Sequence, residues 1–350
     1  MHLLTNTAPI DPKTPLMGIL APGEWLMHDQ NAFEFALMAE RGTVELAGIR
    51  RIDRNASFDP VLIVRSGAFG DLLLASPAIR AFREKRPDRE VVLSCFDIRR
   101  QLFEHTDLFD GFADYPLPYS EIANYSEIIS LENVIETAHD KHATDAFAEA
   151  LGVTVTDYKP VNVVTPEEKE TARARWQRNR PLVGIQLRAS VRNRDYPAAL
   201  WSKVILELEN RGWDVLLFGS KGQIPPLPPE MRRTYIRDLS QHDLTFRETC
   251  AALANCAAFA GVDSALIHVC HALDIPAVGL YGPFPWQIRT AHAPKTEALT
   301  GTGACAGCCW HAKLGQHFPP GQPCYEKQIC WVLATIPPER IVSKIDAMKP

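Results

Sequence analysis

The chain has 350 residues, of which 46% are hydrophobic and 23% charged, a globular composition with enough length for two domains. Its net charge of −5 and pI of about 6.1 exclude the basic field that is typical of nucleic-acid binding. The sequence shows no signal peptide, and no apolar run approaches the ~20 residues of a membrane span. We therefore expect a cytoplasmic protein without a membrane span and without nucleic acid as a partner.

Residues 1–58 differ from the rest of the chain. Prolines early in this segment oppose long helices, namely Pro9, Pro12, Pro15 and Pro22. The short runs 33–37 and 43–47 predict two strands joined near Arg41-Gly42. We predict a β-rich extension over 1–58. The sequence leaves open whether it packs on the next domain, binds a partner or builds an oligomer.

The rest of the chain is organised around Val61–Arg86. Four apolar residues, 61–64, predict a buried strand, and a glycine-containing turn and a helical pattern follow. The turn contains Ser66, Gly67 and Gly70, and it lies where an open α/β sheet places its ligands. Asp71 is unsuited to a phosphate site because its charge would repel the anion. It is therefore either a helix N-cap or a base that faces a neutral hydroxyl.

Strands and helices then alternate twice, which predicts two doubly wound parallel sheets. The first alternation has strands expected at 90–96, 127–131 and 161–164, and helices at 98–104 and 140–151. Thr165 caps a charged helix that we expect to run to Arg180 and to bridge two domains. The second alternation has strands expected at 182–187, 213–218, 257–260 and 276–281, and helices at 197–211, 245–253, 265–273 and 338–348.

A second candidate site follows two strands of the second alternation. Three arginines lie within seven residues after the strand 182–187, at Arg188, Arg192 and Arg194. Their positive charges suit an anionic ligand, although a single surface arginine is usually only solvated. Asp263, Ser264 and Ala265 open a helix whose amide groups could hold phosphate oxygens, but Asp263 could also be a plain N-cap. His268 on this helix is more often a packed histidine than a catalytic one.

Three segments together resemble glycosyltransferase family 9, the heptosyltransferases of lipopolysaccharide core assembly. These segments are 61–83, 183–201 and 260–283, and the resemblance spans roughly residues 60–300. It implies an α/β protein of the GT-B fold, in which two Rossmann-like domains face a cleft. It also implies an inverting transfer of heptose from ADP-heptose to a hydroxyl of a lipopolysaccharide-core-type glycan. In this scheme residues 59–165 are the acceptor domain and 166–300 the nucleotide-sugar donor domain.

The resemblance assigns roles to residues of this sequence. It makes Asp71 the base, and it places Ser66, Gly67 and Gly70 in the acceptor-side turn. The implied donor-binding residues are Arg188, Arg192, Arg194, Gly219, Asp263, Ser264, Ala265, His268 and Gly282. The family usually has a lysine before an aromatic-Pro pair, where this chain has Arg194-Asp195-Tyr196-Pro197, and we prefer Arg194 to Arg192 for the diphosphate. The chain has no Asp-x-Asp motif, so we expect no catalytic metal.

Five of the nine cysteines lie within 26 residues near the end of the chain, in the insert 301–335 that precedes a C-terminal helix at 336–350. Their spacing predicts a structural zinc or iron site with Cys305, Cys308, Cys324 and Cys330 as ligands and Cys309 as an alternate. Thiols without metal, or disulfides in an exported protein, are the alternatives. The cluster is similar to the four-cysteine iron finger of bacterial autotransporter heptosyltransferases, which implies protein serines as a second acceptor class.

Other functions stay open at this point. A sugar-nucleotide epimerase of the same fold would turn over the donor without an acceptor. A non-catalytic GT-B protein would bind a nucleotide-sugar and transfer nothing. The acceptor is expected to be a glycan, a lipid-linked glycan or a protein. Peripheral membrane association and an oligomer built through residues 1–58 are left open.

Overall fold

The computed structural model describes residues 3–5, 25–27, 50–52, 60–117, 124–138, 140–224, 227–308 and 330–350. The chain divides into two compact units, Met1–Asp157 and Tyr158–Pro350, and each is described by itself below. The strands predicted at 33–37 and 43–47 lie outside the described residues, as do Cys309 and Cys324. In the part of the chain that the structure describes, no helix is both long and apolar enough to cross a membrane.

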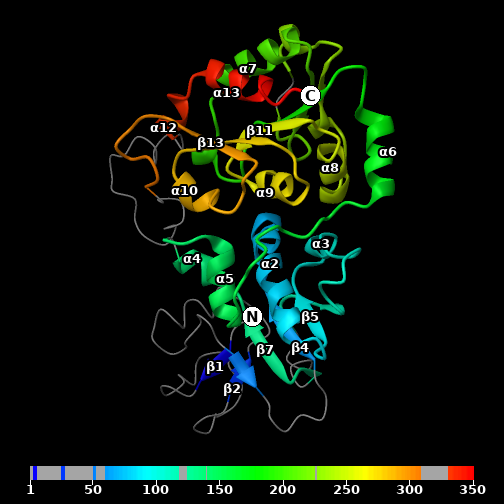
Figure 1. The fold of residues 1–350 in the computed structure, drawn as a ribbon, viewed down its shortest axis with the longest axis vertical. Helices are drawn as coiled ribbons and strands as arrows, with labels where there is room; N and C mark the ends of the chain where they lie inside the picture. The colour runs from blue at the N-terminus through cyan, green and yellow to red at the C-terminus, as the bar shows by residue number, and fades with distance from the viewer. Residues whose placement is uncertain are drawn as a thin grey trace. The chain divides into compact units, whose positions relative to one another are not determined.

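Unit 1 contains a five-stranded sheet in the order β3-β7-β4-β5-β6 (Figure 1). Its strands are β3 (Arg50–Ile52), β4 (Val61–Val64), β5 (Val91–Ser94), β6 (Gly111–Ala113) and β7 (Glu127–Ser130). All pairs are parallel except β3 with β7, so a segment of the predicted N-terminal extension adds an antiparallel edge strand. Two more short strands form a separate antiparallel pair, β1 (Leu3–Thr5) and β2 (Trp25–Met27).

The helices of unit 1 are α2 (Phe69–Lys85), α3 (Asp97–Arg100), α4 (Val134–Thr137) and α5 (Ala143–Leu151). Helix α2 is the connection from β4 to β5, and it packs beside α5. Its apolar side chains at three- and four-residue spacing, such as Leu72, Leu73, Ile79 and Phe82, are fully buried. Gly152 ends α5 with a φ of 65°, a left-handed conformation that favours glycine, as its position after the helical pattern predicts.

Unit 2 contains a six-stranded, fully parallel sheet in the order β10-β9-β8-β11-β12-β13. Its strands are β8 (Leu182–Gln186), β9 (Asp214–Phe218), β10 (Ile236–Asp238), β11 (Ala258–Val262), β12 (Ala277–Tyr281) and β13 (Thr296–Thr300). Its helices are α6 (Pro166–Trp176), α7 (Ala198–Asn210), α8 (Phe246–Leu253), α9 (Ala265–Ala272), α10 (Trp286–Arg289), α12 (Trp331–Ala334) and α13 (Pro338–Asp346).

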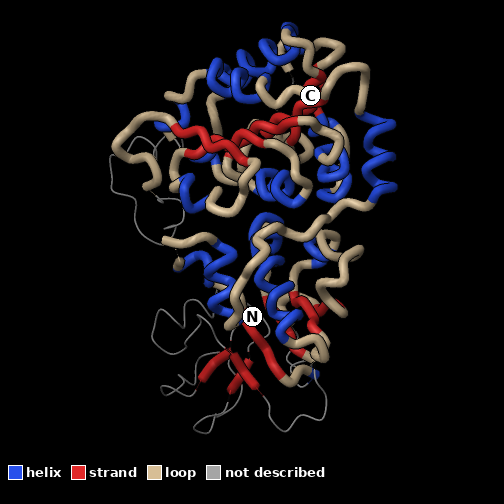
Figure 2. The backbone as a smooth tube through the Cα atoms, viewed as in Figure 1, coloured by secondary structure: helices blue, strands red, loops and turns tan. Residues whose placement is uncertain are grey.

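Helices cover both faces of the unit 2 sheet (Figures 1 and 2). Helices α7 and α13 lie side by side on one face, and α8 and α9 lie on the other. Val204 and Leu208 of α7 and Ile341 and Ile345 of α13 are buried in one core with the strands. The C-terminal helix is therefore part of unit 2. Thr165 caps α6 through a reciprocal pair of hydrogen bonds with Glu168, as the sequence predicts.

Several sequence predictions are wrong in detail. Residues 161–164 form no strand, because the Val164 N–H donates to the Asn162 side chain at 3.0 Å and the segment joins no sheet. The helix expected to reach Arg180 ends at Trp176, and the helix expected at 98–104 covers only Asp97–Arg100. The strands β6, β10 and β13 are found where none was predicted.

Each sheet has a point where the strand order reverses. In unit 1 the chain moves from β4 to β5 and β6 in one direction, and β7 lies on the other side of β4. In unit 2 the chain moves from β8 to β9 and β10, and β11 then lies on the other side of β8. Ligands of open α/β sheets bind at the carboxyl ends of the strands on either side of such a point. The residues that follow β4 and β7, and those that follow β8 and β11, are therefore the candidate sites.

Candidate functional site

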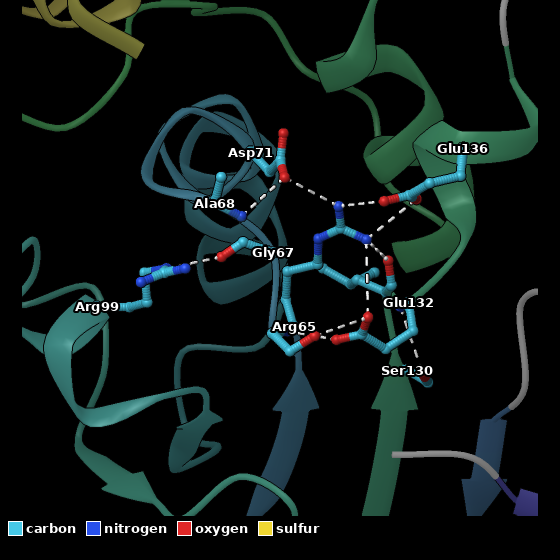
Figure 3. Close-up of polar contacts among 10 residues, drawn as sticks. Arg65, Gly67, Ala68, Asp71, Arg99, Ser130, Glu132 and Glu136 are labelled. Atoms are coloured by element: carbon cyan, nitrogen blue, oxygen red, sulfur yellow. Dashed lines mark hydrogen bonds and ion pairs between the residues drawn. The ribbon is translucent and has the colours of Figure 1, made fainter. Parts of the chain in front are cut away.

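In unit 1, polar contacts at the switch point centre on Arg65, which directly follows β4 (Figure 3). Its side chain is 1% exposed. The guanidinium donates from Nη1 and Nη2 to the two carboxylate oxygens of Glu136, at 3.2 and 2.8 Å, and from Nη1 to the Leu131 carbonyl at 3.0 Å. Burial alone would lower the pKa of Arg65, but the hydrogen bond and charge of Glu136 outweigh burial and raise the pKa. Arg65 therefore stays a cation.

Asp71 lies in the first turn of α2 and is held through one carboxylate oxygen. Oδ2 accepts hydrogen bonds from the Ala68 N–H at 2.9 Å and from Arg65 Nη2 at 3.3 Å. None of the described residues donates to Oδ1, and Figure 3 shows this oxygen pointing away from the network. The side chain is 30% exposed, so Oδ1 can meet a hydroxyl group. The helix starts at Phe69, so Asp71 is its third residue and not the predicted N-cap.

Gly67 lies in the turn between β4 and α2, at a position where a side chain would be crowded. A Cβ atom at this position would lie 2.6 Å from Arg65 Nε and 2.7 Å from Asp71 Oδ2. The Gly67 carbonyl accepts a hydrogen bond from Arg99 Nε at 2.9 Å. Gly67 is thus packed between the buried cation and the carboxylate. The second predicted glycine of the turn, Gly70, lies within the first turn of α2.

Glu132, two residues past the end of β7, holds the other side of the turn. It accepts hydrogen bonds from the Ser66 backbone N–H and, at 3.1 Å, from the Ser66 hydroxyl. Tyr115 lies near Glu132 and Ser66. Burial, and to a lesser extent the negative charge of Glu132, raises the pKa of Tyr115 to about 12. Ser66, Gly67 and Asp71 are therefore brought together, as the strand–turn–helix pattern predicts.

In unit 2, the three predicted arginines after β8 differ in their surroundings. Arg194 donates from Nη1 to the Asp263 carbonyl at 3.0 Å and from Nη2 to the Ser190 hydroxyl at 2.9 Å. Arg188 donates from Nε to Asp195 Oδ2 at 3.1 Å. Arg192 is exposed. Arg194 is therefore fixed at the switch point between β8 and β11.

Asp263 follows β11 and is 5% exposed. Its Oδ2 lies 3.7 Å from the Nε of Arg289, a residue of α10. Ser264, not Asp263, is the N-cap residue of α9, and its hydroxyl donates to the side-chain oxygen of Gln186 at the end of β8. The first amide groups of α9, beginning at Ala265, open at the same sheet edge. A buried carboxylate with two arginines beside it leaves this edge with an excess of positive charge.

The remaining predicted donor residues have packing contacts. Burial lowers the pKa of His268 to about 4, although the charge of Asp263 opposes the change, so the imidazole is neutral at pH 7. Gly219 follows β9, and a Cβ there would lie 3.1 Å from Gln223 Oε1. Gly282 follows β12, and a Cβ there would lie 2.7 Å from the sulfur of Cys330.

Three cysteines of the predicted metal site lie in the described part of unit 2. Cys330 is buried beside Gly282, whose carbonyl accepts a hydrogen bond from the Gly307 N–H at 2.8 Å. Burial raises the pKa of Cys330, and the charges of Cys305 and Cys308 act in the same direction, so the three thiols share one neighbourhood. Their sulfurs do not all lie within 4.8 Å of one another. The described residues therefore show three nearby thiols but no assembled metal site, and the predicted fourth ligand, Cys324, lies outside them.

The sequence analysis did not predict several residues that contact and orient the predicted site residues. Arg65 had a signal, because a charged residue directly after a buried strand lies at the ligand-binding edge of the sheet. Glu132 had the same signal after β7. Glu136 and Arg289 had none, because they lie in short helices that no periodic pattern marks.

Two sequence comparisons give matches to known proteins. A family model described as glycosyltransferase family 9 (heptosyltransferase) matches residues 123–312. Lipooligosaccharide heptosyltransferase 2 of Haemophilus influenzae is 27% identical over 201 residues, which cover 55% of this chain and 54% of that protein. The chain therefore spans about half the length of this curated relative.

Solved structures show the same fold. ADP-heptose LPS heptosyltransferase II of E. coli superposes with a TM-score of 0.61 at 15% identity, covering 83% of this chain and 98% of that one. The iron-containing dodecameric glycosyltransferase TibC of enterotoxigenic E. coli gives a TM-score of 0.63 at 16% identity, covering 87% and 80%. A second TibC structure, in complex with ADP-D-β-D-heptose, gives 0.62 at 16% identity, covering 87% and 78%. The predicted α/β fold of GT-B type is confirmed.

Proposed function

This chain belongs to glycosyltransferase family 9, the heptosyltransferases, and from this membership we propose that it transfers a heptose from ADP-heptose with inversion to a hydroxyl group of a lipopolysaccharide-core-type glycan. The observation that carries the proposal is the geometry of Asp71. Its Oδ2 is held by Ala68 and Arg65, while its Oδ1 is open at the switch point of unit 1. A carboxylate held in this way is suited to act as a general base toward a neutral hydroxyl.

In the proposed reaction, Asp71 accepts the proton of the acceptor hydroxyl as its oxygen attacks the anomeric carbon of the donor. The bond from that carbon to the diphosphate oxygen breaks, and ADP leaves with the bonding electrons. Arg194, Arg188 and the first amide groups of α9 lie where they can stabilise the charge on the diphosphate. Arg289 adds a cation that the sequence did not predict.

The donor is supported by the names of the similar proteins, which include an ADP-heptose heptosyltransferase and a complex with ADP-D-β-D-heptose. In this proposal unit 1 carries the acceptor and unit 2 carries the donor, with the boundary near residue 165. The chemistry needs no metal, because the arginines and the helix amides supply the positive charge. The predicted cytoplasmic location and the oligomer built through residues 1–58 stay part of the proposal.

We also propose that Cys305, Cys308, Cys324 and Cys330 hold a structural iron or zinc ion. The buried Cys330, which lies beside Gly282 and is influenced by the charges of Cys305 and Cys308, supports this site. When bound, the ion would tie the insert to the end of β12. Elemental analysis of the purified protein should find about one ion per chain. A Cys305→Ser and Cys308→Ser double variant should lose it, and metal content unchanged in this variant would contradict the assignment.

The main experiment incubates the protein with ADP-heptose and one of two acceptors, followed by mass spectrometry of the acceptor and measurement of ADP release. A heptose-deficient lipopolysaccharide core should gain one heptose. An autotransporter passenger protein is the second acceptor, because the resemblance of the cysteine cluster to the iron finger of autotransporter heptosyltransferases makes a protein O-heptosyltransferase the alternative. Binding of ADP without transfer to either acceptor would leave a nucleotide-sugar-binding protein. Release of ADP without an acceptor would indicate hydrolysis or an epimerase-like reaction.

A further inference from the structure

The contacts of Arg65 go beyond what a catalytic base requires. The guanidinium is buried, so it cannot touch a substrate, yet it lies between two partly exposed carboxylates. Nη2 donates both to Asp71 Oδ2 at 3.3 Å and to Glu136 Oε1 at 2.8 Å. The second nitrogen, Nη1, donates to Glu136 Oε2 and to the Leu131 carbonyl. The hydrogen bonds to Glu136 and Leu131, which follow β7 in the chain, therefore fix the orientation of the guanidinium that donates to Asp71.

Fixing Arg65 also fixes the rotation of the Asp71 carboxylate. Two donors, the Ala68 N–H and Arg65 Nη2, converge on Oδ2, and both directions are set by groups that cannot move freely. One comes from the backbone of the N-cap residue, and the other comes from a buried, bidentate ion pair. With Oδ2 occupied twice, Oδ1 is the oxygen that remains for a ligand.

We propose that Arg65 is a positioning residue for Asp71, held in place by Glu136, and that it presents Oδ1 to the acceptor hydroxyl. The inference rests on the proposed function, because it assumes that Asp71 is the base. The contacts of Arg65 with Glu136 and Asp71 would then take part in the reaction by orienting the base. An arginine is required for this task, since a lysine ammonium has no planar fork with which to hold Glu136 and Asp71 together.

The competing interpretation is that Arg65 only stabilises the fold, as a buried ion pair does. The two differ in kinetics. If Arg65 acts through Asp71, Arg65→Lys lowers kcat by about tenfold to a hundredfold through misplacement of the base, and the KM values for donor and acceptor stay within about threefold. In an Asp71→Asn background, Arg65→Lys causes no further loss, because the group that it positions is absent. A purely structural role predicts lower stability with an unchanged kcat, or equal losses in both backgrounds.

Glu136→Gln is the second kinetic variant, because Glu136 is 48% exposed and glutamine keeps the size of the side chain while removing its charge. It should lower kcat less than Arg65→Lys does. Glu149→Gln is the matched control: Glu149 is also an exposed acid in a helix of unit 1, and it pairs with Lys141 at 2.8 Å. Its kcat should equal that of the wild type. Equal kcat values for wild type, Glu136→Gln and Arg65→Lys would overturn the proposal.

A crystal structure of Arg65→Lys decides the question without any activity. The proposal expects the Asp71 carboxylate to rotate, or to occupy two orientations, once one of its two donors is lost. An Asp71 that keeps the same single orientation would overturn it. If the wild-type protein transfers no sugar, the proposed function fails by itself, and the structure of this variant still tests the positioning of Asp71.

Discussion

The two switch points share one local fold and have opposite charge arrangements. After β4 of unit 1, a single buried cation, Arg65, contacts the carboxylates of Asp71, Glu132 and Glu136. After β11 of unit 2, the buried carboxylate of Asp263 has Arg289 beside its side chain and Arg194 on its carbonyl. A cation among carboxylates suits a neutral hydroxyl that must lose a proton. A carboxylate among arginines suits an anion such as a diphosphate.

The comparison also shows what the strand–turn–helix unit leaves undecided. Both sites use the carboxyl edge of a parallel sheet at the reversal of strand order. The fold therefore sets where a ligand binds, and the charges that follow the strands set which ligand it is. Changing one charged group in each site is the direct way to test this division.

The largest effect is expected from Asp71→Asn, which keeps the size of the side chain and removes the base. We expect kcat to fall by about 10²–10⁴-fold, the range for general base catalysis, with the KM for the donor within about threefold. ADP release in the presence of acceptor measures the rate. Asp97→Asn is the control, since Asp97 is an exposed acid in the first turn of α3 in the same unit. If Asp71→Asn is as active as Asp97→Asn, Asp71 is not the base, and the assignment of the unit 1 site to the acceptor hydroxyl is wrong.

The next largest effect is expected for the stability of unit 2 at acid pH, through His268. The folded protein holds the pKa of His268 at about 4, while an unfolded imidazole has a pKa of 6.5. Between these values the unfolded state binds a proton and the folded state does not, so the free energy of unfolding falls as the pH drops from 6.5 toward 4. The full contribution is about 3 kcal/mol, and it is absent above pH 6.5. At pH 5 the loss reaches about 2 kcal/mol, and denaturant unfolding at pH 7 and pH 5 measures it.

His268→Gln removes the titrating group and separates this effect from packing. Because the substitution also changes packing at pH 7, the two proteins are compared by the change in the free energy of unfolding between the two pH values. We expect a smaller loss of stability on acidification in His268→Gln. A loss equal to that of the wild type would show that another group causes the acid sensitivity.

Arg194 and Arg192 allow a sharper test of the positive site. Arg194 is fixed by two hydrogen bonds, whereas Arg192 is exposed two residues away. Arg194→Met should weaken ADP binding by about 1.5–3 kcal/mol, the value of a hydrogen bond to a charged group. Arg192→Met is the matched control and should change it by less than about 1 kcal/mol. Isothermal titration with ADP measures both, and the reverse order would contradict the assignment of Arg194.

The sequence predicted the parts of these sites that depend on neighbouring residues. The turn from β4 into α2, the Thr165–Glu168 cap and the glycine at the end of α5 all follow from local spacing. The N-cap was one of the two alternatives for Asp71, and it would start the helix at Leu72. The helix instead begins three residues earlier, at Phe69, so Asp71 is its third residue and its carboxylate accepts the Ala68 N–H. Such a difference of one turn is set by hydrogen-bond geometry that residue spacing does not contain.

The parts that could not be predicted depend on partners far apart in the chain. Arg65 meets Glu136 across 71 residues, and Ser66 meets Glu132 across 66. Arg289 reaches Asp263 from a four-residue helix without a periodic signal. These pairs form only because the sheet order brings β7 beside β4 and the segment after β12 beside β11. A single sequence does not give the order of the strands, so the charged groups that meet at each site could not be predicted.

The smallest effect is expected from Gly67→Ala, and it tests the acceptor side through packing alone. The added Cβ would lie 2.6 Å from Arg65 Nε and 2.7 Å from Asp71 Oδ2. Flexible side-chain ends usually move away from such a contact, but Arg65 is buried and its hydrogen bonds to Glu136 and Leu131 hold it. We therefore expect a loss of about 1–2 kcal/mol in the free energy of unfolding, together with a several-fold lower kcat.

Gly111→Ala is the control for this variant, because a Cβ at Gly111 of β6 meets only Val92 Cγ2, at an ordinary distance of 3.8 Å. Thermal unfolding and ADP release compare the two variants. If Gly67→Ala is as stable and as active as Gly111→Ala, the guanidinium and the carboxylate can move apart without cost. The charge network of unit 1 would then not hold Arg65 and Asp71 in fixed positions, in contrast to the fixed arginines of unit 2.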